Sequence, residues 1–230
     1  MTTCAILQPS YIPWRGYFHQ IQKSDVFVFY DDVQYDKHGW RNRNRVKTAN
    51  GTVWLSVPVR HKGNVTQGIP IKDIEIAWDQ LWSAKHWATV TQSYARAPHF
   101  RRYAPLLEPY YAGRPRLLVD LTINLTIELA RALGLETRFV RSSELGIGGH
   151  RTARLLAILQ ALGADRYVCG PASRAYLEED ELTAAGIAVE YMRYDYPTYP
   201  QLHPPFDGQV SILDPLFMLG PEAPRQMWSP

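Results

Sequence analysis

Residues 5–30, AILQPSYIPWRGYFHQIQKSDVFVFY, decide the fold of this 230-residue chain. The apolar run at 5–7 ends in a turn punctuated by two prolines, and large apolar residues then recur at the i, i+3, i+4, i+7 spacing of a helix. These residues are Trp14, Tyr17, Phe18 and Ile21. A second run, at 26–30, is rich in β-branched and aromatic residues, which is typical of a strand. The order strand, loop, helix, strand predicts a βαβ unit with two parallel strands.

The same alternation returns in the C-terminal half of the chain. Residues 137–140, 167–169 and 187–191 are predicted strands, and leucines at the spacing of a helix lie between the first two, at 155–162. Alternating helices and strands are typical of a parallel sheet covered by helices. We therefore predict an α/β fold with a Rossmann-like parallel sheet core. A last helix is predicted to begin near Ser211 or Asp214, either of which can cap it.

Between these halves the sequence predicts an addition to the core. Asn50-Gly51 is a hairpin-type turn, and strands are predicted at 52–59 and 71–76, joined by an exposed loop through residues 61–64. Residues 80–133 are predicted to be a mostly helical insertion, because leucine recurs every fourth residue near its end. The length fits a single domain, residues 1–230, in which the proline-rich residues 221–230 form a loose C-terminal tail.

Composition limits the classes of protein to which the chain can belong. Hydrophobic residues make up 46% and charged residues 20% of the sequence, so it can bury a core and is not globally disordered. The net charge of +3 is too small to indicate a nucleic-acid binder by itself. Two cysteines without C-x-x-C spacing indicate neither a disulfide framework nor a zinc site. No run approaches the ~20 apolar residues of a membrane span, so we expect a cytoplasmic protein.

The turn after the first predicted strand is the first candidate ligand site. In open α/β sheets ligands bind at the carboxyl ends of strands, and helix N-termini attract anions. Gln8 and Tyr11 are therefore candidate ligand-binding residues, and Gly16 would let a ligand approach the helix. The alternative is structural: the two prolines stiffen the turn and Trp14 packs in the core. We favour the structural role for Trp14 and the binding role for the turn.

A second candidate follows the second predicted strand. Asp31 and Asp32 are candidate catalytic residues, because a carboxylate there can act as a general base, and Gln34 and Tyr35 are candidate ligand contacts. Successive residues of a strand point to opposite faces, so the two carboxylates are not expected to share one site. We expect one to face the ligand and the other to cap a turn or pair with an arginine. A purely structural role for both is the alternative.

The polar segment at 38–47 is the third candidate. Arginine recurs at every second position, so in an extended chain the arginines would share one face and the intervening asparagines the other. Forked guanidinium groups bind phosphate or carboxylate, which favours an anion site over the alternative of a solvated charged edge. The candidate ligand-binding residues are Trp40, Arg41, Asn42, Arg43, Asn44 and Arg45, with His38 as a candidate catalytic residue.

Other features carry weaker signals. The glycine-rich run at 146–149 lacks the Lys-Ser/Thr of a phosphate-binding P-loop, although Arg151 and Arg154 after it can add phosphate contacts. Cys169 lies at a predicted strand-to-helix turn, where a thiol can act as a nucleophile, but buried free cysteines are usually inert. His203 lies in a loop and has no assigned role. The sequence specifies no cofactor and no set of metal ligands.

Three motifs in these segments resemble those of the WbqC-like family: ILQPSYIPWRGYF at 6–18, DDVQY at 31–35 and WRNRN at 40–44. Later segments are also similar, and the resemblance covers nearly the whole chain. The family is associated with bacterial O-antigen and other surface-glycan gene clusters and with specialised-metabolite clusters. The resemblance therefore implies a role in such biosynthesis, without supplying a catalytic residue. This sequence departs from the expected pattern at Cys169, where a small residue such as serine is expected.

We expect the chain to be a transferase that moves an acyl or aminoacyl group from an activated, phosphate-bearing donor to an amine such as an amino sugar. In this hypothesis the three arginines hold the anionic part of the donor. Asp32 or His38 acts as the base, and Asn42 or Gln34 orients the acceptor. The expected partner is thus a small molecule with phosphate or carboxylate groups.

Two alternatives stay open. A nucleotidyltransferase has a similar order of elements, but its His-x-x-His signature is missing, since residues 14–17 read Trp-Arg-Gly-Tyr. The second alternative is a non-catalytic protein that binds a nucleotide sugar or nucleic acid through the segment rich in tryptophan and arginine. The modest net charge makes nucleic acid the less expected partner.

Overall fold

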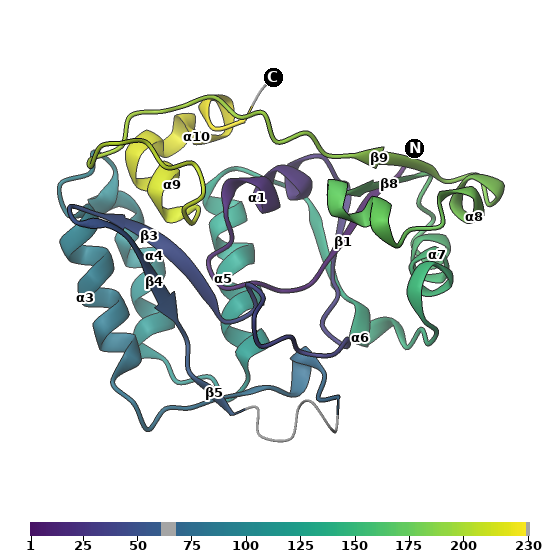
Figure 1. The fold of residues 1–230 in the computed structure, drawn as a ribbon, viewed down its shortest axis with the longest axis horizontal. Coiled ribbons are helices and arrows are strands. Elements are labelled where there is room, and N and C mark those ends of the chain that lie inside the picture. The colour runs from purple at the N-terminus through teal and green to yellow at the C-terminus, as the bar shows by residue number, and fades with distance from the viewer. Residues whose placement is uncertain (61–67, 229–230) are drawn as a thin grey trace.

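A five-stranded parallel sheet forms the centre of the computed structural model, which describes residues 1–60 and 68–228 (Figure 1). The strands are β1 (Thr3–Leu7), β2 (Val26–Phe29), β7 (Arg138–Arg141), β8 (Arg166–Cys169) and β9 (Ala188–Tyr191). They are arranged in the order β7-β2-β1-β8-β9, and every neighbouring pair is parallel. The predicted α/β fold with a Rossmann-like core is confirmed. The winding direction reverses between β1 and β8, which makes this pair the switch point of the sheet.

Helices cover both faces of this sheet. Ala5, Phe27 and Phe29 point to the face covered by α1 (Arg15–Gln22) and α5 (Leu118–Ala132). The alternate residues, Cys4 and Val28 among them, point to the face covered by α7 (Arg151–Ala161) and α8 (Glu179–Ala184). Because side chains alternate along each strand, strands with apolar residues at every position are buried on both faces.

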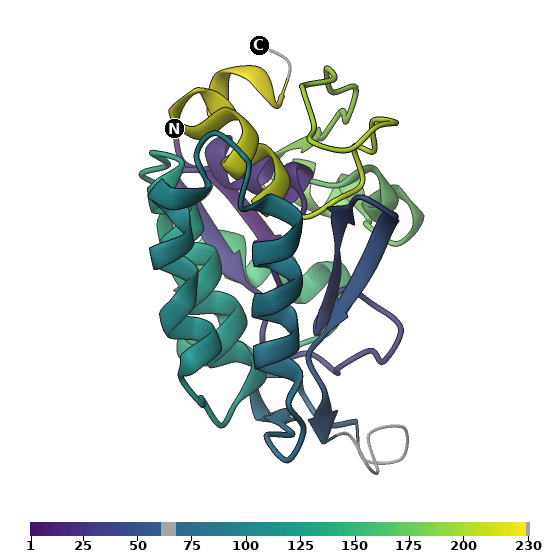
Figure 2. The ribbon, with the colours of Figure 1, turned by 90° about the vertical axis from the view of Figure 1, so that its left-hand side faces the viewer.

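The chain between β2 and β7 builds a second layer beside the sheet. A hairpin of β3 (Arg43–Thr48) and β4 (Gly51–Ser56) stands next to α3 (Trp82–Tyr94), as Figure 2 shows. The helix α4 (Phe100–Ala112) packs between α3 and α5. Within the stretch 80–133 that was predicted to be helical, α5 packs on the sheet and is the crossover helix between β2 and β7. The exposed loop predicted at residues 61–64 lies outside the described residues.

One predicted strand differs from the structure. Residues 71–76 contain a short 3-10 helix, η1 (Ile71–Asp73), and only two strand residues, β6 (Glu75–Ile76), which pair with β5 (Val59–Arg60). The apolar residues Ile71, Ile74 and Ile76 are buried. Ile71 and Ile74 are three positions apart, which is the spacing of residues on one face of a 3-10 helix. The alternation that predicted a strand here arises from two short elements in succession.

The C-terminal segment packs on α1. It contains α9 (Leu213–Leu219), η3 (Gly220–Glu222) and α10 (Ala223–Gln226), followed by the buried residues Met227 and Trp228. Arg15 Nη1 donates a hydrogen bond to the carbonyl of Met227 at 3.0 Å, and Trp228 stacks on His19. The sequence predicted a loose tail from residue 221, whereas the structure shows short helices and buried side chains up to residue 228. Apolar burial, which local composition does not reveal, outweighs the two prolines.

Two short elements complete the description, α6 (Ser142–Leu145) after β7 and η2 (Pro171–Ala175) after β8. Both begin at the carboxyl ends of core strands. Within residues 1–60 and 68–228, no helix combines the length and the apolar composition that crossing a membrane requires.

Candidate functional site

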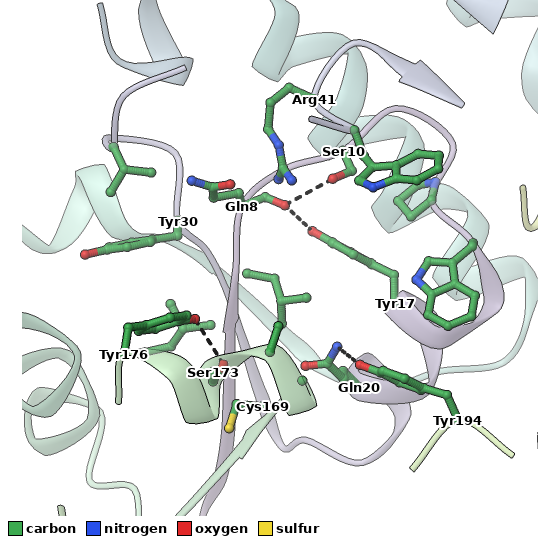
Figure 3. Close-up of a pocket in the computed structure, with 18 of the residues that line it drawn as sticks. Gln8, Ser10, Tyr17, Gln20, Tyr30, Arg41, Cys169, Ser173, Tyr176 and Tyr194 are labelled. Carbon is green, nitrogen blue, oxygen red and sulfur yellow. Dashed lines mark hydrogen bonds between the residues drawn. The ribbon is translucent and has the colours of Figure 1, made fainter. Parts of the chain in front are cut away.

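A cavity of about 930 Å³ opens at the switch point of the sheet (Figure 3). Its walls come from the carboxyl ends of β1, β2 and β8 and from the starts of α1, α7 and η2. Ligands of open α/β sheets bind at this position, because the loops on either side of it diverge. The polar and charged lining consists of Gln8, Ser10, Gln20, Arg41, Asn44, Arg45, Arg151, Cys169, Ser173 and Gln209. The aromatic lining consists of Trp14, Tyr17, Tyr30, Trp40, Tyr167, Tyr176 and Tyr194.

The backbone at Gln8 is held by hydroxyl groups, which positions its side chain. Tyr17 donates a hydrogen bond to the carbonyl of Gln8 at 3.2 Å, and Ser10 donates to the same oxygen at 3.5 Å. In Figure 3 the Gln8 amide lies between Tyr30 and Arg41. The proposed ligand-binding position of Gln8 thus lies in the cavity lining.

The first turn of α1 is covered by an indole ring. A Cβ atom on Gly16 would lie 2.3 Å from Cζ2 of Trp14, so glycine is required for Trp14 to fold over the helix. Trp14 also makes an edge-to-face contact with Tyr194 at 5.0 Å between ring centroids. Gly16 therefore admits the chain's own tryptophan, whereas the sequence predicted that it admits a ligand.

Three arginines contribute the charge of the cavity. Arg41 donates to the carbonyl of Pro9 at 3.2 Å and lies 3.4 Å from the Asp36 carboxylate, and Arg45 donates to the carbonyl of Gln209 at 2.8 Å. Burial lowers the pKa of Arg41, but an arginine remains protonated at neutral pH. Among the described residues no acidic side chain lines the cavity. The arrangement favours an anionic ligand.

Arg151 is the first residue of α7 and has a strained backbone. Its φ is +49°, in the left-handed region that non-glycine residues rarely adopt, and Gly149 before it has φ +110°. A Cβ on Gly149 would stand 3.3 Å from Cβ of Arg154, so this tight turn also needs glycine. The Arg151 side chain is exposed and forms no hydrogen bond or ion pair with the rest of residues 1–60 and 68–228. It is therefore free to bind an anion at the positive end of the helix dipole.

Part of the cavity lining is polar but uncharged, and we call it the uncharged end. Gln20 is 3% exposed and donates from Nε2 to the hydroxyl of Tyr194 at 3.0 Å, while its Oε1 has no hydrogen-bond partner within the described part of the chain. Ser173 and Tyr176, which also line the cavity, share a hydrogen bond of 3.0 Å (Figure 3). Burial raises the pKa of Tyr194 to about 12, so its phenol keeps its proton at neutral pH.

Cys169, the last residue of β8, lies at this uncharged end. Burial raises the pKa of its thiol to about 11, which outweighs the opposing hydrogen bond from Ser173. The nucleophilic form of cysteine is the thiolate, and the raised pKa keeps Cys169 a neutral thiol at neutral pH. Cys4, the other cysteine, is also free and buried.

The two carboxylates of the second candidate lie outside the cavity lining. Asp31 is fully buried and accepts hydrogen bonds from the backbone N–H and the hydroxyl of Ser143, at 3.0 and 2.8 Å. Asp32 accepts from Ser142 at 2.6 Å and pairs with Arg154 at 2.5 Å. Ser142 Oγ also lies 3.2 Å from Asp31, so the carboxylates share one serine and do not diverge as in a strand. They anchor α6 and α7 to the end of β2.

Several other predicted residues hold the loop after β1 in place. Tyr11 is buried, with its hydroxyl 2.8 Å from Tyr111 and 3.1 Å from His86. Asn44 donates to the carbonyls of Tyr11 and Ile12, at 3.2 and 2.9 Å, which ties the hairpin to this loop. Asn42 similarly donates to Val57 at 2.7 Å. Of these residues Asn44 reaches the cavity lining.

The remaining predicted residues divide between the cavity rim and the surface. Trp40, Arg41 and Arg45 line the cavity, whereas Arg43 points away and donates to the carbonyls of His38 and Gly39. His38 and Gln34 are exposed, and Tyr35 is buried. The sequence did not indicate Gln20, Ser173, Tyr176, Tyr194 or Gln209. His203, which had no assigned role, lies with Nε2 3.3 Å from the carbonyl of Ser93 on α3. No group of metal-ligating side chains occurs in the described ranges.

Comparisons with known proteins agree with the motifs. The sequence model of the WbqC-like protein family matches residues 8–226. A Mycobacterium tuberculosis protein described as uncharacterized protein Rv1507c is 39% identical over 226 residues, which cover 97% of this chain and 96% of that protein. No solved structure matches the chain. The family match spans nearly the whole chain, including the β1–α1 turn and the arginine segment that build the cavity, and the chain therefore belongs to the WbqC-like protein family.

Proposed function

We propose that this chain is a transferase of surface-glycan or specialised-metabolite biosynthesis, which moves an acyl or aminoacyl group from an activated, phosphate-bearing donor to an amine. The observation that carries the proposal is the charge of the switch-point cavity. Three arginines line it, and the described lining contains no acidic side chain. Membership of the WbqC-like family supports a biosynthetic role.

The arginine end suits the phosphate-bearing part of the donor. Arg151 lines the cavity from the start of α7 and has an uncommitted guanidinium group within the described residues, and Arg41 lines the same cavity from the segment before β3. Guanidinium groups bind phosphate through forked hydrogen bonds and stabilise the negative charge that a leaving phosphate acquires. The donor would therefore lie with its phosphate towards these arginines.

The uncharged end suits the amine. Gln20 Oε1 is buried without a partner in residues 1–60 and 68–228 and can accept one N–H of an amine. An ammonium ion is disfavoured here, because burial lowers the pKa of a bound amine. The neutral amine is the nucleophilic form, so this environment favours the reactive species.

The reaction then follows from the two ends. The amine nitrogen attacks the acyl carbonyl carbon, a C–N bond forms, and the bond from that carbon to the phosphate oxygen breaks with its electron pair on the phosphate. The amine loses one proton, which the departing phosphate can accept. Asp31, Asp32 and His38 lie outside the cavity lining and have no part in this scheme.

Ligand-induced stabilisation tests the proposal. We would compare the wild-type protein with Arg151→Gln and with Arg101→Gln, a control on the exposed face of α4. The probes are pyrophosphate, acetyl phosphate, acetyl-coenzyme A and an acyl adenylate, each followed by mass spectrometry of an amino-sugar acceptor for amide formation. A ligand at a hundred times its dissociation constant stabilises the folded state by about 2.7 kcal/mol.

The expected result is a thermal shift in the wild type and Arg101→Gln that is reduced in Arg151→Gln, with an amide product from one donor. If no phosphate compound shifts the melting temperature, or if both variants respond equally, the cavity is not the anion site. Binding without any amide product would leave an anion-binding protein and would overturn the transferase assignment.

A further inference from the structure

Two tryptophans are exposed beside each other at the arginine end of the cavity. Trp40 and Trp54 have 44% and 48% of their surface exposed, and their ring centroids lie 5.3 Å apart at an angle of 31°. Trp82 and Trp228, in contrast, are buried. Neighbouring exposed indoles keep a large apolar area in water, which in a folded protein is typical of a binding surface.

Arginines are interleaved with these indoles. The Arg43 guanidinium lies 4.7 Å from the centroid of the Trp54 ring, and that of Arg45 lies 5.6 Å from Trp54 and 6.0 Å from Trp40. The register of the hairpin pairs Arg45 directly with Trp54 across β3 and β4. Backbone carbonyls fix Arg43, which donates to His38 at 2.6 Å. We name Trp40, Arg43, Arg45 and Trp54 the indole–arginine surface.

This surface continues the cavity without being part of it. Trp40 and Arg45 belong to both, whereas Arg43 and Trp54 lie outside the cavity lining. A ligand whose phosphate binds Arg41 or Arg45 would therefore have its next group at the two indoles. That group must be flat to stack on indole and guanidinium planes, and it must not be positively charged, because two arginines lie beside it.

We propose that the indole–arginine surface binds the base of a nucleoside phosphate, so that the donor of the proposed transfer is nucleotide-linked. This inference rests on the proposed function and names its donor class. A nucleobase has the required flat π-system and is one ribose away from its phosphate. Stacking on aromatic and arginine side chains contributes strongly to nucleotide binding and needs no base-specific hydrogen bonds.

Separate measurement of base and phosphate binding tests the inference. Isothermal titration would compare ADP, UDP, GDP and CDP with inorganic pyrophosphate, on the wild type, Trp54→Ala, Trp54→Phe and the control Leu81→Ala, which removes another exposed apolar side chain. We expect Trp54→Ala to weaken the best nucleoside diphosphate about tenfold and to leave pyrophosphate unchanged. Trp54→Phe should recover most of the loss, since it restores a π-face.

Three outcomes would overturn the inference: no nucleoside diphosphate binds more tightly than pyrophosphate, Trp54→Ala binds nucleotides normally, or Trp54→Ala weakens pyrophosphate equally. A single-stranded oligonucleotide that binds more tightly than every nucleoside diphosphate, with an affinity that falls steeply with salt, would assign the surface to nucleic acid instead. Failure of the proposed function is a separate result, because pyrophosphate would then not bind, or would bind Arg151→Gln as well as the wild type.

Discussion

The Nη2 atom of Arg154 lies 2.5 Å from Oδ2 of Asp32, and this ion pair holds the start of α7 against the end of β2. Both side chains are largely buried, at 10% and 17% exposure. Arg154 also stacks over Tyr30 at 4.9 Å and donates from Nε to the carbonyl of Ile147. The Asp32 carboxylate, a candidate general base from the sequence, thus pairs with Arg154 and supports the turn that carries Arg151.

Asp32→Asn should destabilise the protein without removing a reacting group. The amide keeps the shape but loses the charged partner of Arg154, and a hydrogen bond between charged groups contributes about 1.5–3 kcal/mol. We expect the free energy of unfolding to fall by about 2 kcal/mol in urea titrations. Asp180→Asn, on the exposed first turn of α8, is the control. An Asp32→Asn protein of normal stability that lost all transfer activity would restore the general-base role.

Gly16→Ala should be strongly destabilising, and the loss should depend on Trp14. The new methyl group would overlap the indole, and overpacking of this kind costs about 1–3 kcal/mol. A double-mutant cycle with Trp14→Ala checks the cause. If the ring is responsible, Gly16→Ala costs little once Trp14 is alanine, apart from the small effect of helix propensity. Equal costs in both backgrounds would contradict this explanation.

Gln20→Leu should weaken amine binding and spare phosphate binding. Leucine has a similar volume but no acceptor oxygen, so an amino sugar should bind about tenfold more weakly, the cost of one lost hydrogen bond of about 1.4 kcal/mol. Pyrophosphate, which we propose binds the arginines of the cavity, should bind normally. Gln22→Leu changes the same residue type at an exposed position of α1 and is the matched control. Titration of each protein with both ligands tests this prediction. An equal loss of pyrophosphate binding would contradict the proposal that amine and phosphate bind at different ends of the cavity.

The two buried cysteines should make the fold sensitive to alkaline pH. The pKa of Cys169 is raised from its ordinary 9.0 to about 11, and that of Cys4 to about 12. Between about pH 9 and 11 the unfolded chain has therefore lost thiol protons that the folded chain retains. Stability falls with rising pH where the folded state binds more protons, so the free energy of unfolding should decline over this window.

Denaturant titrations at pH 8, 9, 10 and 11 measure this decline. Cys169→Ser should show a smaller slope than the wild type, because a serine hydroxyl does not ionise in this range. The same variant should retain transfer activity, since a thiol with a pKa of about 11 is not the nucleophile at neutral pH. An inactive but folded Cys169→Ser protein would make the thiol part of the mechanism.

Local sequence determined the elements of the core. The spacing of Trp14, Tyr17, Phe18 and Ile21 predicted α1, and the apolar runs on either side predicted β1 and β2, because helical and strand periodicity are properties of neighbouring residues. Among the candidates taken from the sequence, Gln8, Trp40, Arg41 and Arg45 also line the cavity. Family motifs at 6–18 and 40–44 cover Gln8, Trp40 and Arg41, and Arg45 follows directly after the second motif.

Tertiary structure alone decided which distant residues meet. The order β7-β2-β1-β8-β9 brings the end of β8 beside the end of β1, and so places Cys169 and Ser173 in one cavity with Gln8. Tyr194 reaches Gln20 across 174 positions of sequence, and Arg154 reaches Asp32 across 122. The serine and arginine partners of Asp31 and Asp32 lie more than a hundred residues away, so the sequence did not reveal these contacts. Contacts between residues so far apart in sequence depend on which apolar faces pack together, and the periodicity of a short segment does not show which faces these are.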